Sequence, residues 1–156
     1  RVGFYQYGLT LREYRESAAR FDLTDIVHFE GTIPSDEALS RIKGASLLVL
    51  LPTRNAPTAI PGKAYEYLRT GKPILMVSEE NTTTEFMKRF SGVYHVLPDD
   101  ENKCLDIINQ VYNESRGPKA AFNDAEIRKY DRRNLTGSLA REFNALLAGG
   151  AARNRR

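Results

Sequence analysis

Short apolar segments alternate with amphipathic segments along the chain, and this alternation predicts an α/β protein. Five apolar segments have the length and composition of strands, and they cover residues 2–7, 26–29, 46–51, 74–77 and 93–96. The segments Leu47–Leu51 and Ile74–Val77 are apolar throughout, which is typical of strands buried on both faces of a parallel sheet. We therefore expect a doubly wound parallel sheet with helices on both faces.

The segments between these strands carry helix signals. Ser35 is expected to cap one helix, and Asn81 or Thr82 another, with Glu85 placed to complete a capping box. A helix that follows Asp99 or Asp100 is expected to bury Leu105, Ile108, Val111 and Tyr112. The helix predicted at 12–21 is expected to face inward with Leu11, Tyr14, Ala18 and Phe21.

Beyond residue 114 the pattern predicts helices only. A short helix at 124–130 is expected to precede a longer one with an apolar stripe, formed by Leu135, Leu139, Phe143, Leu146 and Leu147. Gly149, Gly150 and the basic residues after them predict a frayed end. The expected organisation is a sheet domain at 1–114, a helical extension of the same domain at 115–148, and a disordered basic tail at 149–156.

The stretch 59–75 is the best-defined helical unit. Pro61 suits a first helical turn, while Gly71 and Pro73 suit a helix end. Its inward face is expected to comprise Ile60, Ala64, Tyr67 and Leu68. Lys63 and Glu66 lie three positions apart on a different face, so a cation and a carboxylate point the same way.

Ligands of open parallel sheets bind beyond the carboxyl ends of the strands, where this helix begins. The backbone N–H groups of Ile60, Gly62 and Lys63 are expected to be available to a phosphate. The carboxylate of Glu66 is placed to accept hydrogen bonds from hydroxyls such as those of a ribose. The alternative is that Lys63 and Glu66 form only a surface ion pair, worth less than about 1 kcal/mol.

Composition narrows the classes of function. The net charge of +3 on 156 residues is too small to predict a nucleic-acid partner. The single cysteine, Cys104, excludes an internal disulfide, and no apolar run approaches the ~20 residues of a membrane span. We therefore expect a cytoplasmic protein.

Several common catalytic motifs are absent from the sequence. No GxGxxG follows the first predicted strand, and GxxxxGK[S/T] does not occur. His28 and His95 are the only histidines, so with one cysteine they predict structural roles and no metal site. Ser35 and Ser78 have no histidine nearby in sequence, which leaves a Ser-His-Asp triad unsupported.

The stretch Pro61–Leu75 closely resembles the donor-binding motif of glycosyltransferases with the GT-B fold. The matching residues are Pro61-Gly62-Lys63, Glu66-Tyr67-Leu68 and Gly71-Lys72-Pro73-Ile74-Leu75. The most similar subset is the bacterial group 1, or family 4-like, enzymes of cell-surface polysaccharide assembly. Two flanking segments, 27–34 and 45–51, also resemble that family, and the resemblance extends from Arg1 to Tyr112.

This resemblance implies the Rossmann-like, C-terminal half of a two-domain enzyme. The enzyme would bind a nucleoside diphosphate sugar and transfer the sugar, with retention, to a glycan or lipid-linked acceptor, without a cofactor or metal. Glu66 would hold the donor ribose, and the diphosphate would lie at Ile60, Pro61, Gly62 and Lys63. The turn Gly31-Thr32-Ile33 would contact the base, with Gly8 and Thr58 as further candidates.

Three features depart from the family pattern. Thr58 stands where the family often has the first of two glutamates, the one that meets the sugar. The strand with the basic diphosphate clamp and the acceptor-binding N-terminal domain both lie outside this chain. We therefore expect a sheet that lacks part of the full domain, catalytic residues upstream, and a chain that alone binds nucleotide weakly and transfers nothing.

Partners follow from the same resemblance. An open sheet edge predicts self-association, and the stripe at 135–147 is a second cause, because the last helix of relatives packs across to the other domain. The absent domain would carry any peripheral contact with the inner membrane.

Two other functions stay open. A nucleotide-sugar epimerase of the same fold would bind the same ligands but is expected to bring more acid–base groups into its cleft. A non-enzymatic nucleotide-binding or interaction module would keep the fold without the chemistry, in agreement with Thr58.

Overall fold

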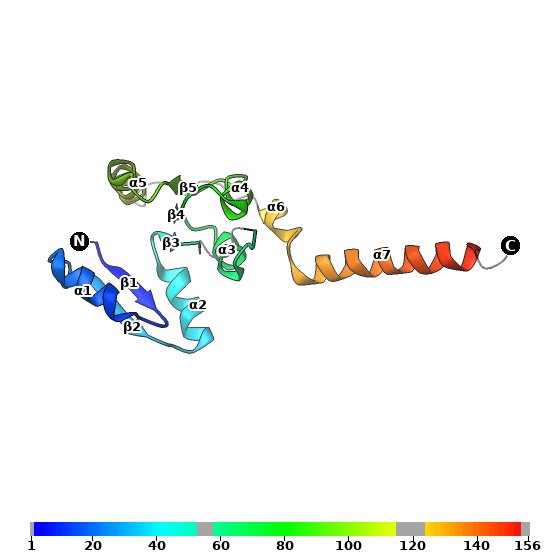
Figure 1. Ribbon diagram of the computed structural model, residues 1–156, viewed down its shortest axis with the longest axis horizontal. Coiled ribbons are helices and arrows are strands. Elements are labelled where there is room, and N and C mark those ends of the chain that lie inside the picture. Colours follow the sequence, from blue (N-terminus) through cyan, green and yellow to red (C-terminus); the bar gives the residue numbers. More distant parts are fainter. Residues whose placement is uncertain (1, 53–57, 115–123, 154–156) are drawn as a thin grey trace. The chain divides into compact units, whose positions relative to one another are not determined.

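The computed structural model describes residues 2–52, 58–114 and 124–153. The chain divides into two compact units, Arg1–Ala45 (unit 1) and Ser46–Arg156 (unit 2), which Figure 1 colours blue to cyan and cyan to red. The described strands form one small open sheet in each unit, and every strand pair is parallel. The protein therefore has a mixed α/β fold with parallel strands, as the apolar pattern predicts.

Unit 1 contains β1 (Phe4–Tyr7), α1 (Arg12–Arg20), β2 (Val27–Gly31) and α2 (Ser35–Gly44). Strands β1 and β2 pair in parallel, from Phe4 opposite Val27 to Tyr7 opposite Gly31. Ser35 does not cap α2, because Pro34 occupies the N-cap position and Ser35 is already helical. A threonine or serine cap needs extended backbone at its own position, which Pro34 supplies instead.

Unit 1 has a small interior. Ala18 is the one described residue of this unit that is buried. The expected inward residues Leu11, Tyr14 and Phe21 are exposed by 43%, 50% and 63%. A sheet of two strands offers too little surface to cover an entire helix face, which explains the difference.

Unit 2 contains the larger sheet, with strand order β3-β4-β5. Its strands are β3 (Leu48–Leu50), β4 (Ile74–Val77) and β5 (Val93–Val96). Its helices are α3 (Gly62–Leu68), α4 (Thr82–Met87), α5 (Glu101–Glu114), α6 (Asp124–Arg128) and α7 (Arg132–Arg153). With β1 and β2 of unit 1, all five strands predicted from the short apolar segments are present.

Helix α5 covers one face of the β3-β4-β5 sheet. Its residues Ile107 and Val111 form a buried cluster with Leu75 of β4 and Val96 of β5. The predicted inward residues Leu105 and Tyr112 are instead 57% and 43% exposed. The inward face of α5 consists of Cys104, Ile107, Ile108 and Val111, which are spaced as i, i+3, i+4 and i+7. Leu105 and Tyr112 lie toward the edge of this face.

The opposite face of this sheet is also buried. Ile74 and Met76 alternate with Leu75 along β4 and are 1% and 0% exposed, and α3 contacts β3. Four aromatic rings from α3, α4, the turn after α4 and the turn after α6 pack at centroid distances of 5.0 to 6.4 Å, and they are Tyr65, Phe86, Phe90 and Tyr130. Arg69 bonds Asp131 at 3.1 Å, which fastens the start of α7 near α3.

The start of α4 confirms the predicted N-cap residue and corrects its capping-box partner. Asn81 is the N-cap, and its side chain accepts from the backbone N–H of Thr84 at 3.1 Å. Thr84, and not Glu85, completes the box by accepting from the N–H of Asn81 at 2.7 Å. The box partner belongs three residues after the cap, a position that Thr84 occupies.

Helix α7 is longer than predicted. It continues through Gly149 and Gly150 to Arg153, where the sequence predicts a frayed end. Ala148, Ala151 and Ala152 surround the glycines, and alanine has the highest helix propensity. Residues 154–156, and the predicted break at 115–118, lie outside the described residues. None of the described helices combines the length and apolar character needed to cross a membrane.

Candidate functional site

The predicted site lies at the start of α3, which follows β3 and precedes β4. Pro61 is the N-cap and Gly62 the first helical residue, one position later than predicted. No side chain caps this end of the helix. Helix α3 spans 7 residues, fewer than the predicted three turns, so side chains contribute more to any site here than the helix dipole.

The two ends of α3 are fixed by backbone and packing. Ala64 and Leu68 are 0% and 1% exposed, and they anchor the inward face that the sequence predicts. Gly71 adopts a φ of +64°, a left-handed conformation that ends the helix as predicted. The helix is therefore a rigid support for the side chains on its outer face.

Lys63 and Glu66 are both exposed on that outer face. Among the described residues, no ion pair joins their side chains. The structure therefore does not show the surface ion pair that the sequence offers as the alternative. Tyr67, the neighbour of Glu66, has a pKa raised first by burial and second by the charge of Glu66.

The start of α3 is tied to the start of α4. The hydroxyl of Thr83, which is 1% exposed, donates to the backbone carbonyl of Ala59 at 3.1 Å. The segment just before Ile60 is thus held against α4, which itself follows β4. Both helices begin at the carboxyl edge of the β3-β4-β5 sheet, the edge where ligands of such sheets bind.

Ser78 adds a polar atom at this edge that sequence reasoning did not assign. It follows β4 directly, is 6% exposed, and its Oγ has no hydrogen-bond partner among the described residues. Its backbone is fixed, because its N–H donates to Val96 O at 3.1 Å and its carbonyl lies 2.8 Å from His95 Nε2. A serine directly after an apolar strand is the sequence signal that could have marked it.

Lys88, Glu80 and His95 form a charged and polar cluster near the carboxyl edge of the β3-β4-β5 sheet. Lys88 pairs with Glu80, whose other carboxylate oxygen accepts from the Thr84 hydroxyl at 3.1 Å. Lys88 holds the pKa of the Glu80 carboxyl below its usual value, because the hydrogen bond favours the charged form. His95 donates from Nε2 to a carbonyl oxygen that can only accept, and its Nδ1 lies 3.7 Å from Glu80. This arrangement agrees with the structural role expected for His95.

The predicted base-contacting residues belong to unit 1. Gly8 follows β1, and its N–H donates to the carbonyl of Gly31 at the end of β2, at 2.6 Å. Thr32 is exposed and Ile33 is half-buried in the connection to α2. Unit 1 thus brings together Gly8 and the turn at 31–33, while unit 2 brings together the residues of α3. Thr58 is described and exposed, close before α3 in sequence.

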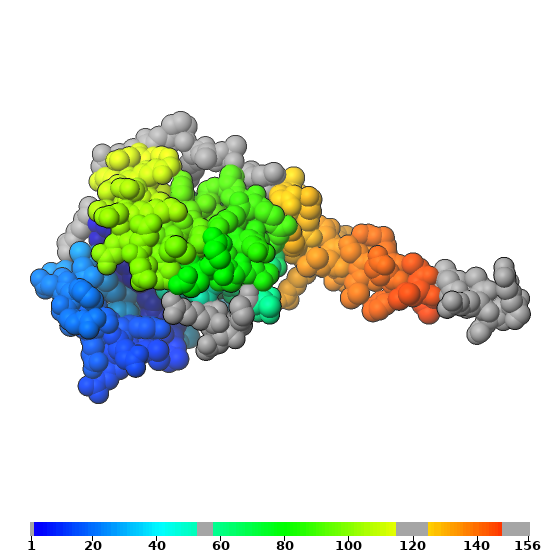
Figure 2. Space-filling model, turned by 45° about the horizontal axis from the view of Figure 1, so that its top comes forward, coloured from blue at the N-terminus to red at the C-terminus, as the bar shows by residue number. Residues whose placement is uncertain are grey.

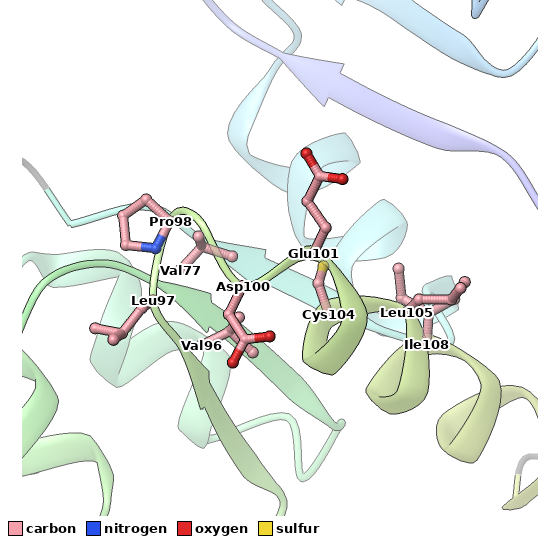
Figure 3. A pocket seen from close by; sticks show the side chains of 9 residues that line it. All are labelled: Val77, Val96, Leu97, Pro98, Asp100, Glu101, Cys104, Leu105 and Ile108. Atoms are coloured by element: carbon pink, nitrogen blue, oxygen red, sulfur yellow. The ribbon is translucent and has the colours of Figure 1, made fainter.

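A pocket of about 250 Å³ lies elsewhere in unit 2, on the α5 face of the sheet. Figure 3 shows Val77 and Val96 from the strands beside Cys104, Leu105 and Ile108 from α5. The remaining lining residues are Leu97, Pro98, Asp100 and Glu101. An apolar wall with two carboxylates suits no phosphate, so this pocket does not share the chemistry predicted for α3.

The described residues contain no cluster of three or more histidines, cysteines, aspartates or glutamates that could hold a metal ion. No family model, no curated protein and no solved structure matches the chain. The site is therefore characterised by its own geometry: an exposed lysine and carboxylate on a well-anchored helix at the carboxyl edge of a parallel sheet.

Proposed function

We propose that this chain is the donor-binding half of a glycosyltransferase, which binds a nucleoside diphosphate sugar at the outer face of α3. The observation that carries the proposal is the pair Lys63 and Glu66. Both are exposed, neither is used in an ion pair with the other, and their helix is anchored by Ala64 and Leu68. The likeness of Pro61–Leu75 to the donor-binding motif of GT-B enzymes supports the same assignment.

Each residue has a distinct role in the proposal. The Glu66 carboxylate accepts hydrogen bonds from the two ribose hydroxyls. The side chain of Lys63 and the backbone N–H groups of Ile60, Gly62 and Lys63 bind the diphosphate, with the lysine as the main charge because α3 is short. Contact of the turn at 31–33 with the base stays a prediction from the resemblance, with Gly8 as a further candidate.

The reaction proposed is glycosyl transfer with retention. The bond between the anomeric carbon and the diphosphate oxygen breaks, a bond forms between that carbon and the oxygen of an acceptor hydroxyl, and the hydroxyl proton passes to the departing diphosphate. Positive charge and N–H donors stabilise the nucleoside diphosphate as negative charge develops on it. The acceptor site and the basic clamp belong to the part of the enzyme outside this chain, so the 156-residue chain is expected to bind and not to transfer.

The proposal also specifies the fold in more detail and the cellular location. The fold is a Rossmann-like, doubly wound sheet that lacks part of the full domain. Parallel strands and the burial of both faces of the β3-β4-β5 sheet support this. An unpaired strand edge is a cause of self-association. The setting is the cytoplasm, with no nucleic-acid partner and no cofactor.

Calorimetric titration with UDP, GDP, TDP and their sugars tests this function. Glu66→Gln should weaken nucleoside diphosphates about tenfold or more, because a hydrogen bond to a charged group contributes about 1.5–3 kcal/mol. Its effect on inorganic diphosphate should be small, whereas Lys63→Gln should weaken both ligands. Asp106→Asn, which removes an exposed carboxylate from α5, is the matched control and should change neither.

The alternatives have their own outcomes. Absence of binding to every nucleotide by the folded chain would reject the donor site and favour an interaction module. Binding followed by conversion of the sugar to an epimer would favour the epimerase. Equal binding by Glu66→Gln and the unsubstituted chain would refute the ribose assignment alone.

A further inference from the structure

Glu66 has a cation on each side of it along α3. Lys63 stands three positions before it, and Arg69 stands three positions after it. Arg69 is the C-cap residue of α3 but keeps a helical backbone, with a φ of −68° and a ψ of −17°, so the helical spacing extends to it. Residues three apart on a helix are neighbours, and the pair is more favourable when the carboxylate precedes the cation. By position, Arg69 is therefore the cation of α3 that is best placed to pair with Glu66.

Arg69 forms its ion pair with a different carboxylate. Its Nη1 donates to Oδ2 of Asp131 at 3.1 Å, 62 positions further along the chain. Among the residues that the structure describes, Glu66 takes part in no ion pair. The distant carboxylate thus holds the cation that the helical spacing would offer to Glu66.

The carboxylate of Asp131 is fixed in place. Asp131 directly precedes α7, and its Oδ1 accepts from the backbone N–H of Arg133 at 3.0 Å. This hydrogen bond first, and Arg69 second, hold the pKa of the Asp131 carboxyl below its ordinary value, because both favour the charged form. Asp131 therefore presents a charged acceptor to Arg69 at neutral pH.

Packing brings Asp131 to α3 independently of the ion pair. The preceding residue, Tyr130, packs its ring against Tyr65 of α3 and Phe86 of α4, at centroid distances of 5.8 and 5.0 Å. Figure 2 shows α6 and the start of α7, in yellow to orange, directly beside the green surface that includes α4. An acceptor that packing already holds loses less side-chain entropy on pairing than a mobile glutamate does, which favours Asp131 as the partner of Arg69.

We propose that Asp131 is a positioning residue for the ligand site on α3, because it holds the guanidinium of Arg69 away from Glu66. The carboxylate of Glu66 then keeps its oxygens for the hydroxyls of a nucleoside diphosphate. Loss of the Asp131 charge releases Arg69, which competes with these hydroxyls for the same oxygens. The inference rests on the proposed role of Glu66 in nucleotide binding, and it gives the junction of α6 and α7 a part in that binding.

The NMR signals of the side-chain carboxyl carbons, followed without ligand, test the contact itself. In the unsubstituted chain, Arg69→Gln should shift the Asp131 signal and leave the Glu66 signal unchanged. In the Asp131→Asn background, Arg69→Gln should shift the Glu66 signal, because the released guanidinium has moved to it. Asparagine caps helices about as well as aspartate does, so α7 should keep its start, which circular dichroism checks. A Glu66 signal that responds to Arg69→Gln equally in the two backgrounds, whether strongly or not at all, would overturn the proposal.

Calorimetric titration of the full chain with UDP, GDP and TDP tests the consequence for binding. Each affinity is divided by that for inorganic diphosphate, which removes the general effect of charge on an anion. Asp131→Asn should lower this ratio about twofold, the factor expected from an ion pair at this helical spacing. Arg69→Gln alone should not lower it, and in the Asp131→Asn background it should restore the lost affinity. Asp106→Asn, which removes an exposed carboxylate from α5, is the matched control and should leave the ratio unchanged.

The two halves of the pair between Arg69 and Asp131 should thus act differently. A purely structural ion pair loses the same contact from either side, so an equal fall of the ratio in Asp131→Asn and Arg69→Gln would overturn the proposal. Absence of nucleotide binding by every folded variant would reject the donor site, and with it the ligand role of Asp131. The carboxyl signals would then still decide whether Asp131 keeps Arg69 away from Glu66.

Discussion

Replacing Leu68 by alanine is expected to destabilise unit 2 strongly. Leu68 is 1% exposed and lies at the C-terminal end of α3, so nearly the whole side chain is removed from water on folding. The substitution deletes three carbons, and transfer at about 0.8 kcal/mol for each methylene gives a loss of about 2.4 kcal/mol. The cavity left behind adds to this, and the total lies within the range of about 2–5 kcal/mol for buried leucines.

Urea unfolding followed by circular dichroism measures the effect. A loss of about 3 kcal/mol should lower the midpoint of thermal unfolding by about 6–12 °C for a chain of this size. Leu105→Ala is the matched control, because Leu105 is 57% exposed and its loss should cost less than about 0.5 kcal/mol. Equal losses for the two variants would show that α3 does not pack on the sheet as described.

Three further predictions concern backbone, charge and the orphan hydroxyl. Gly71→Ala should cost about 1–2 kcal/mol of unfolding free energy because its φ is +64°. Gly44 lies at the end of α2 with open space around it, so Gly44→Ala should raise the unfolding free energy by about 0.4–1 kcal/mol. A loss of stability in both glycine variants would contradict this reasoning. The pKa of Glu80 is lowered by Lys88, so its contribution to stability is full above the unfolded pKa and is lost as pH falls through the folded one. Glu80→Gln should therefore flatten the fall in the urea midpoint between about pH 6 and about pH 3, and an unchanged slope would refute the pairing. Ser78→Ala should raise the unfolding free energy, by up to about 1–3 kcal/mol, because the buried Oγ has no described partner. A clear loss of stability in urea would show that the hydroxyl is bonded.

The strands were predictable because their signal is local. Runs such as Leu47–Leu51 and Ile74–Val77 are apolar enough to specify buried parallel strands without knowledge of their neighbours. The same holds for the end of α3, where Gly71 and Pro73 act through their own backbone conformations. The anchoring of α3 through Ala64 and Leu68 followed from helical periodicity, which is also local.

The residues whose burial was predicted incorrectly from the sequence depend on their tertiary surroundings. Leu105 and Tyr112 are as apolar as Ile107, and only the sheet beneath α5 decides which of the adjacent faces turns inward. Tyr14 and Phe21 share a helical face with Ala18, but the sheet of unit 1 is too small to bury them. Ser78 is a similar case, because only the packed structure shows that its hydroxyl is enclosed.

The strand order has a consequence for how this chain assembles. Each strand pairs with one that precedes or follows it directly along the chain, and paired residues lie only 19 to 26 positions apart, so the entropy lost on closing each loop is small. In unit 2, β4 adds to the edge of β3 and β5 then adds to the edge of β4, so no strand must insert between two that are already paired. The sheet can therefore grow by one strand at a time in the direction of synthesis, with the helices that connect and follow the strands covering its faces.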